Sequence, residues 1–156
     1  MDNDDLLRPT LSEFRQAPAL YSSTGFFVSS FFGGPLAAGV YGTFNSYRLN
    51  RLSSDLPVYV ALVAGAYFLL LVFNNGGQMA AIGDLLGSRP ARTVEVVLRA
   101  FGLATFFAIW LVHRRFFRTA QVTGTKPLSG WLPGVVAFGL GFMANQAFLV
   151  WILGHH

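Results

Sequence analysis

Four long apolar stretches dominate this chain, and each is long enough to cross a lipid bilayer as a helix. The hydrocarbon core of a bilayer is about 30 Å thick and needs about 20 helical residues, or roughly 17 at the short end. The second stretch contains the uncharged run VYVALVAGAYFLLLVF. The pattern predicts an all-α membrane protein, a bundle of four transmembrane helices. The predicted spans are residues 25–47, 57–73, 90–117 and 131–153.

Composition supports a membrane protein over a soluble one. Hydrophobic residues make up 53% of the 156 residues and charged residues only 12%, whereas soluble domains carry about 25% charged residues. The net charge is +4, but the basic residues gather at the ends of the apolar stretches, where membrane anchors lie. No basic face or recognition module appears, so we expect no nucleic-acid partner. The absence of cysteine excludes disulfides, thiolate metal sites and cysteine nucleophiles.

Two segments outside the spans are predicted to lie at the membrane surface. The polar tail, residues 1–24, opens with the acidic MDNDD, unlike a secretory signal. Its Leu7, Leu11 and Phe14 share one helical face, which predicts a short interfacial helix or, alternatively, a disordered tail. In residues 74–88, Met79, Ile82 and Leu86 could share one face of a short surface helix. A re-entrant piece is the alternative for that segment.

Small residues recur at every fourth position of the first span. Such residues let transmembrane helices approach closely, so we expect this stripe and a shorter one on the fourth span to pack the first and fourth helices together. A contact between subunits of a homo-oligomer is the alternative. Pro35, inside the first span, predicts a kink or a break. The stripe residues are Ser30, Gly34, Ala38, Gly42 and Ser46, with Ala137 and Gly141 on the fourth span.

Four polar residues within the predicted spans form a candidate polar site. Glu95 and Arg99 stand four positions apart and should pair on one helix face. Asn145 and Gln146 lie deep in the fourth span, where amides hydrogen-bond to a neighbouring helix. These residues either hold the helices together or bind a polar ligand or a proton.

The run HRRFFR predicts a membrane-surface anchor, because cations attract anionic headgroups and phenylalanine inserts. A docking patch for an acidic partner is the alternative. The anchor residues are His113, Arg114, Arg115 and Arg118. With four spans, the first and third loops would carry six Lys and Arg residues and the other side four. This bias predicts cytoplasmic first and third loops and both termini on the outer side.

Motifs of common enzymes and metal sites are absent from the sequence. We find no phosphate-binding loop, no His-Glu-x-x-His and no Gly-x-Ser-x-Gly motif. We therefore assign no catalytic, cofactor-binding or metal-binding residue. His155 and His156 end the sequence and are either native or part of a tag.

The stretch SSFFGGPLAAGVYGTFNSYRLNRL, residues 29–52, resembles a segment of small uncharacterised bacterial membrane proteins. In those proteins a Phe-Gly-Gly-Pro-Leu-Ala-Gly-type run precedes an Asn and an Arg-rich turn. The resemblance implies a four-helix protein of the bacterial inner membrane and no function. We expect a non-enzymatic accessory, assembly or protective (immunity-type) factor that acts through helix contacts in the bilayer, with a membrane-protein partner or as a homo-oligomer. A small homo-oligomeric transporter or channel is the alternative.

Overall fold

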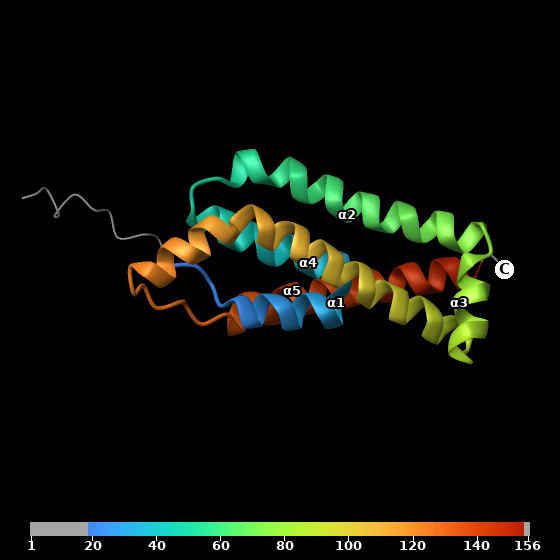
Figure 1. Cartoon of the computed structure of the whole chain (residues 1–156). Helices are drawn as coiled ribbons and strands as arrows, with labels where there is room; N and C mark the ends of the chain where they lie inside the picture. The colour runs from blue at the N-terminus through green and yellow to red at the C-terminus, as the bar shows by residue number, and fades with distance from the viewer. Residues whose placement is uncertain (1–18, 155–156) are drawn as a thin grey trace, which may run out of the picture.

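The computed structural model describes residues 19–154, in which five helices are joined by short loops (Figure 1). The predicted interfacial helix of the tail, like His155 and His156, lies outside the described residues. The all-α prediction is confirmed for the described part of the chain. The helices are α1 (Ser23–Arg48), α2 (Leu52–Asn75), α3 (Gln78–Leu86), α4 (Pro90–Val122) and α5 (Trp131–Leu153).

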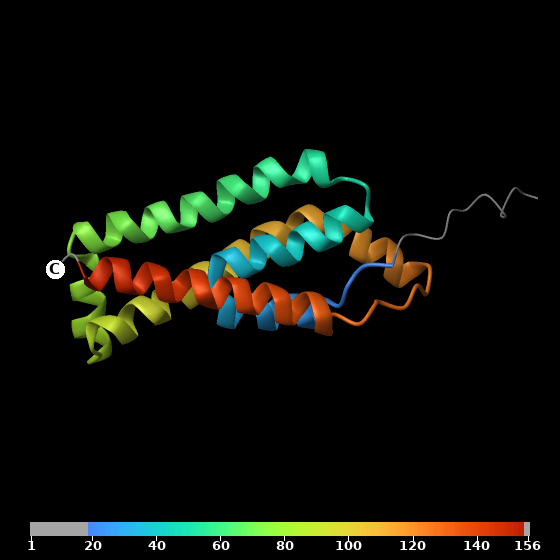
Figure 2. The ribbon, with the colours of Figure 1, turned by 180° about the vertical axis from the view of Figure 1, so that it is seen from behind.

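Within the described residues, three helices are long and apolar enough to cross a membrane. They cover Leu52–Asn75, Arg92–Val122 and Trp131–Ile152, and α2, α4 and α5 run lengthwise along the molecule (Figures 1 and 2). A membrane protein is therefore supported. The predicted bundle of four spans is not what the structure shows, because the first predicted span has a different form.

Helix α1 reverses direction at Gly34, so that its two halves form a hairpin (Figures 1 and 2). Gly34 has φ 69°, in the left-handed region that glycine occupies without a Cβ penalty. Pro35 follows and has no backbone N–H to continue the first half. At 1.5 Å per residue, residues 23–33 and 35–48 measure about 17 and 21 Å, and neither reaches the roughly 30 Å of a bilayer core. The kink predicted at Pro35 is thus a full reversal.

Side chains hold the open end of this hairpin together. The hydroxyl of Tyr41 donates to the carbonyl of Ser22 at 2.8 Å, and the ring of Tyr41 stacks on Phe26 with centroids 4.9 Å apart. The backbone N–H of Tyr21 donates to Asn45 Oδ1 at 2.9 Å. The two halves therefore pack antiparallel along their whole length.

The predicted stripe of small residues is buried throughout, but the reversal divides it and directs it mainly toward α4. A methyl group on Gly102 of α4 would collide with the carbonyl oxygen of Ser30 and with the backbone of Gly34. A methyl group on Gly42 would lie 2.9 Å from Ile109. The residues Ser30, Gly34, Ala38, Gly42 and Ser46 are all buried.

The expected close contact between the first and last predicted helices also forms. A methyl group on Gly141 of α5 would collide with the carbonyl oxygen of Gly33 and lie 2.7 Å from Ala37 Cβ. Ala137, the other stripe residue of α5, is completely buried. The hairpin α1 therefore packs between α4 and α5, with small residues at both contacts.

Helix α2 begins five residues earlier than predicted. The sequence suggested Pro57 as its first residue, but the helix starts at Leu52 and Pro57 lies inside it. The difference places Asp55 in the first turn of α2, where its side chain is buried.

The described chain begins and finishes at opposite ends of the bundle (Figures 1 and 2). Arg48 Nε donates to the carbonyl of Ala19 at 2.9 Å, and the N–H of Ser22 donates to the carbonyl of Leu128 at 3.1 Å. Residues 19–22, 49–51 and 123–130 therefore share one end. Helix α3 crosses the other end (Figure 1) and buries Met79. The three candidate spans thus leave the two ends of the described chain at opposite ends of the bundle (Figure 1), whereas four spans would place them at the same end.

Candidate functional site

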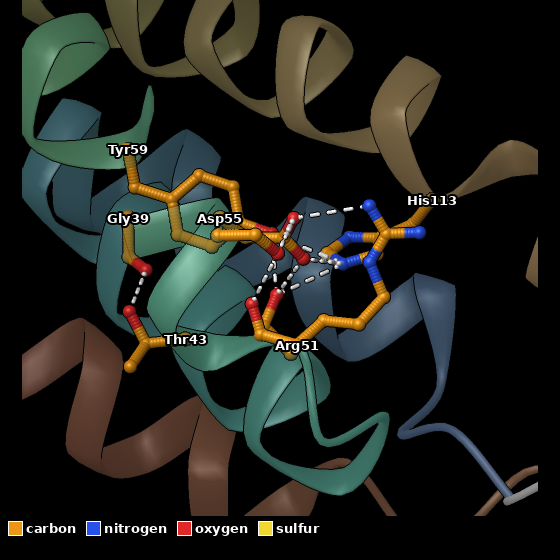
Figure 3. A network of polar contacts seen from close by, with 8 residues as sticks. Gly39, Thr43, Arg51, Asp55, Tyr59 and His113 are labelled. Atoms are coloured by element: carbon orange, nitrogen blue, oxygen red, sulfur yellow. Dashed lines mark hydrogen bonds and ion pairs between the residues drawn. The ribbon is translucent and has the colours of Figure 1, made fainter. Parts of the chain in front are cut away.

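A buried polar network connects three helices near the end of the bundle where the α1–α2 loop and the α4–α5 loop lie (Figure 3). Ser46 comes from the second half of α1, Asp55 and Tyr59 from α2, and His113 from α4. Each of the four side chains is at least 95% buried. Polar groups removed from water in this way cost free energy unless they are hydrogen-bonded to one another.

Short contacts converge on the hydroxyl of Ser46. Its Oγ lies 2.8 Å from Asp55 Oδ2, 2.6 Å from the Tyr59 hydroxyl and 3.0 Å from His113 Nε2. The Tyr59 hydroxyl also lies 3.0 Å from His113 Nε2. The network thus joins residues up to 67 positions apart in the sequence.

One arrangement of protons satisfies all the hydroxyl groups. Ser46 donates to Asp55, Tyr59 donates to Ser46, and Nε2–H of His113 donates to the two hydroxyl oxygens. Nδ1 of His113 is buried and has no partner in the described part of the chain. A bare acceptor there costs less than a buried N–H, which favours the proton on Nε2.

The geometry differs from that of a serine–histidine–aspartate triad. In a triad the carboxylate bonds to Nδ1 of the histidine and the serine to Nε2. Here Asp55 Oδ2 lies 3.6 Å from the same Nε2 that contacts Ser46. Burial also leaves no room beside Ser46 Oγ for a substrate carbonyl. The network therefore holds three helices in a fixed relation.

Arg51 borders the network on the solvent side. Its guanidinium lies 3.5 Å from Asp55 Oδ1 and 5.2 Å from the ring centre of Phe116. Arg51 joins α2 to α4 at the loop, and the cation partly balances the buried carboxylate.

His113 does not lie on the membrane surface, as the anchor prediction required. It is completely buried, because its side chain points from α4 toward α1 and α2 rather than outward. Arg114, Arg115 and Arg118 are exposed, so an anchor made of these three remains a prediction. Asp55 and Tyr59 were not singled out from the sequence. Their spacing of four residues on α2 is a signal that could have pointed to them.

A second polar site lies at the tip of the α1 hairpin, where the structure brings together all four residues of the candidate polar site. Glu95 and Arg99 of α4 and Asn145 and Gln146 of α5 line one cavity of about 70 Å³. Phe32, next to the hairpin tip, also lines it. Two pairs that are about 50 residues apart in the sequence thus face the same space.

Asn145 connects the hairpin tip to α2. Its Nδ2 donates to the carbonyl of Gly33 at 3.2 Å, and its Oδ1 accepts from the Tyr67 hydroxyl at 2.8 Å. Both ends of the amide are therefore used, as expected for an amide that bonds to neighbouring helices.

Glu95 and Arg99 form the expected pair, but it is a weak one. The closest nitrogen and oxygen are 3.8 Å apart, and each side chain is about half exposed. The guanidinium of Arg99 lies 5.9 and 6.0 Å from the ring centres of Phe31 and Phe32. Arg99 therefore lies over the aromatic tip of the hairpin.

An apolar groove of about 720 Å³ runs between the first half of α1 and the start of α5. Gly25, Gly130 and Gly134 line it together with larger apolar side chains, among them Val135 and Phe138. Gly134 has space above it, because the nearest atoms to a methyl group there would be 3.9 Å away.

An apolar cluster lies between the two polar sites. Its members come from α1, α2, α4 and α5 and fill the middle of the bundle. They are Phe26, Ala37, Ala38, Tyr41, Tyr59, Phe106, Ile109 and Ala137. Among the described residues, no group of three His, Cys, Asp or Glu side chains could hold a metal ion.

Comparisons of the chain with protein-family models, with curated proteins and with solved structures give no match.

Proposed function

We propose that this chain is a non-enzymatic integral membrane protein, an accessory, assembly or protective (immunity-type) factor that binds a transmembrane helix of a partner. The observation that supports this is the apolar groove between α1 and α5. Gly134, which has space above it, would let a partner backbone approach closely, which is how helices associate where the hydrophobic effect offers no net drive. The partner helix would lie against Gly134 and Val135.

Cross-linking in native membranes tests this proposal, because the chain contains no cysteine and single cysteines can be introduced freely. We expect Val135→Cys, coupled to a maleimide photo-cross-linker, to capture a partner. Val60→Cys on the exposed face of α2 should not. Gly134→Leu places a side chain in the groove at a position where a methyl group has no atom nearer than 3.9 Å, and it should abolish the adduct. Equal capture at both positions, or capture that survives Gly134→Leu, contradicts the proposal, and an adduct of two copies indicates a homo-oligomer instead.

A small homo-oligomeric transporter or channel is the second candidate, supported by the hairpin α1. Interrupted helices in transporters line substrate sites near the middle of the bilayer, and the cavity at the hairpin tip is polar. The apolar cluster between the two polar sites speaks against a continuous polar path through one chain. Solute flux into liposomes containing the purified protein would support this candidate.

We infer that the chain lies in a bacterial inner membrane with its loop end in the cytoplasm. Among the residues that the structure describes, two basic residues, Arg89 and Arg92, lie near the α3 end, against six at the loop end. An excess of Lys and Arg is typical of cytoplasmic loops. The described chain would then begin in the cytoplasm and finish outside. The six basic residues of the loop end are Arg48, Arg51, Arg114, Arg115, Arg118 and Lys126.

A further inference from the structure

Three strongly polar side chains at the hairpin-tip cavity have no hydrogen bond within the described part of the chain. Glu95 and Arg99 touch only as a loose ion pair at 3.8 Å, and Gln146 is exposed. All three belong to helices apolar enough to span a membrane. A charged or amide group at that depth is costly unless it finds a polar partner.

The direction of these side chains indicates where that partner lies. Arg99 stands nine residues after Pro90, where α4 begins, about 14 Å along the helix axis. Helical side chains tilt toward the N-terminus of their helix, and long cationic ones reach for the membrane surface. Glu95 and Arg99 therefore point toward the leaflet at the α3 end, where lipid headgroups are the nearest polar groups.

We propose that this cavity binds the headgroup of a zwitterionic phospholipid that carries a phosphate and a primary ammonium group, the phosphatidylethanolamine class. The phosphate would accept hydrogen bonds from Arg99, whose planar fork suits phosphate oxygens. The ammonium would donate to Glu95 and to the amide oxygen of Gln146. The rings of Phe32 and Phe142, which also line the cavity, would contact the acyl chains.

Charge and size argue for this headgroup over others. An anionic headgroup has no cationic group of its own to pair with Glu95. The quaternary ammonium of choline has no N–H to donate. The cavity of about 70 Å³ holds about two water molecules at liquid volume. Only the polar atoms of the headgroup can enter it, while the rest of the lipid stays in the leaflet. This proposal does not depend on the apolar groove.

Native mass spectrometry of the full-length protein, with phosphatidylethanolamine, phosphatidylglycerol or phosphatidylcholine added at equal concentration, tests the site. We expect the wild-type protein to retain phosphatidylethanolamine best. Arg99→Gln should weaken that retention about tenfold, the effect of losing a charged hydrogen bond. Glu95→Gln should remove the preference for phosphatidylethanolamine over phosphatidylglycerol. Arg89→Gln removes the same charge near the α3 end, outside the cavity, and should change neither.

Each comparison can overturn the proposal. Arg99→Gln with wild-type retention would do so, as would a wild-type protein without headgroup preference. Unaltered selectivity in Glu95→Gln would also overturn it. The proposal can therefore be tested even if Arg99→Gln folds poorly. Competition by soluble phosphoethanolamine at micromolar concentration would identify a free solute, and not a lipid, as the ligand.

Discussion

Asp55 is the acceptor on which the buried network depends. Ser46 donates to Asp55 Oδ2 at 2.8 Å, and the guanidinium of Arg51 donates to Oδ1 at 3.5 Å. His113 Nε2 lies 3.6 Å from Oδ2. Without this carboxylate, the donors of α1, α2 and α4 would be buried with one acceptor too few. A buried donor left without its partner costs more than the hydrogen bond contributed.

We therefore expect Asp55→Ala to lower the free energy of unfolding by about 2–4 kcal/mol. Ser53→Ala changes an exposed residue two positions earlier on α2 and should have an effect within about 0.5 kcal/mol. Unfolding of both variants by SDS in mixed micelles, followed by circular dichroism, gives the comparison. Equal stability of the two would show that the network contributes nothing to the fold.

At this scale the sequence predicted pairs within one helix and missed groups formed across helices. Glu95 and Arg99 follow from their spacing alone, and the hydrogen-bonding role of Asn145 from the scarcity of amides in apolar helices. The burial of His113 could not be read from HRRFFR, because its partner Ser46 lies 67 positions away. Only the packing of α1 against α4 brings the two together.

At the scale of elements, the hairpin α1 depends on small residues where it meets α4 and α5. The carbonyl of Gly33 and the methyl of Ala37 lie against Gly141, one on each side of the turn. There is no space there for a side chain larger than hydrogen. Close packing on both sides leaves the hairpin a single position between its neighbours.

Gly141→Ala should therefore destabilise the protein by about 1–3 kcal/mol, the usual cost of overpacking. Gly139→Ala, two residues away in the same helix, adds its methyl group where no atom lies within 4 Å. This control should keep or raise stability, because alanine favours helix over glycine. Thermal unfolding in the same detergent compares them. A harmless Gly141→Ala would mean that α5 does not pack against the hairpin in this way.

The sequence indicated the break in α1 but not its size. Gly34 and Pro35 in the middle of an apolar stretch predict a kink, and the stretch itself is long enough for a span. The reversal depends on Tyr41 bonding to Ser22 and on Asn45 bonding to the backbone of Tyr21. These contacts exist only after the chain has folded back, so periodicity along one helix could not reveal them.

At the scale of the whole molecule, the hairpin leaves an odd number of candidate membrane spans, three, where the sequence predicted four. Three candidate spans place the start of α1 at the same end as the loop between α4 and α5. Four spans would place them at opposite ends. The prediction that both termini lie on the outer side assumed four spans, whereas three candidate spans place the start of the described chain on the side of the first loop.

Labelling of single cysteines with a membrane-impermeant maleimide tests this arrangement in bacterial spheroplasts. We expect Leu85→Cys in α3 to react in intact spheroplasts. Ser23→Cys and Thr125→Cys should react only after permeabilisation, because both lie at the loop end, which we propose to be cytoplasmic. Ser23 and Leu85 are exposed, and Thr125 is partly exposed. A chain with four spans would instead label Ser23→Cys together with Leu85→Cys and protect only Thr125→Cys.

The hairpin also gives the protein unequal cross-sections in the two leaflets. At the loop end, both halves of α1 lie beside α2, α4 and α5, so five helical segments displace lipid. Beyond the tip at Gly34, only three long helices continue toward the α3 end. With the loop end in the cytoplasm, as we propose, the wide end of this wedge lies in the leaflet that is compressed on the concave side of a curved cell pole. The density of the protein should therefore fall at the poles relative to the flat cylinder.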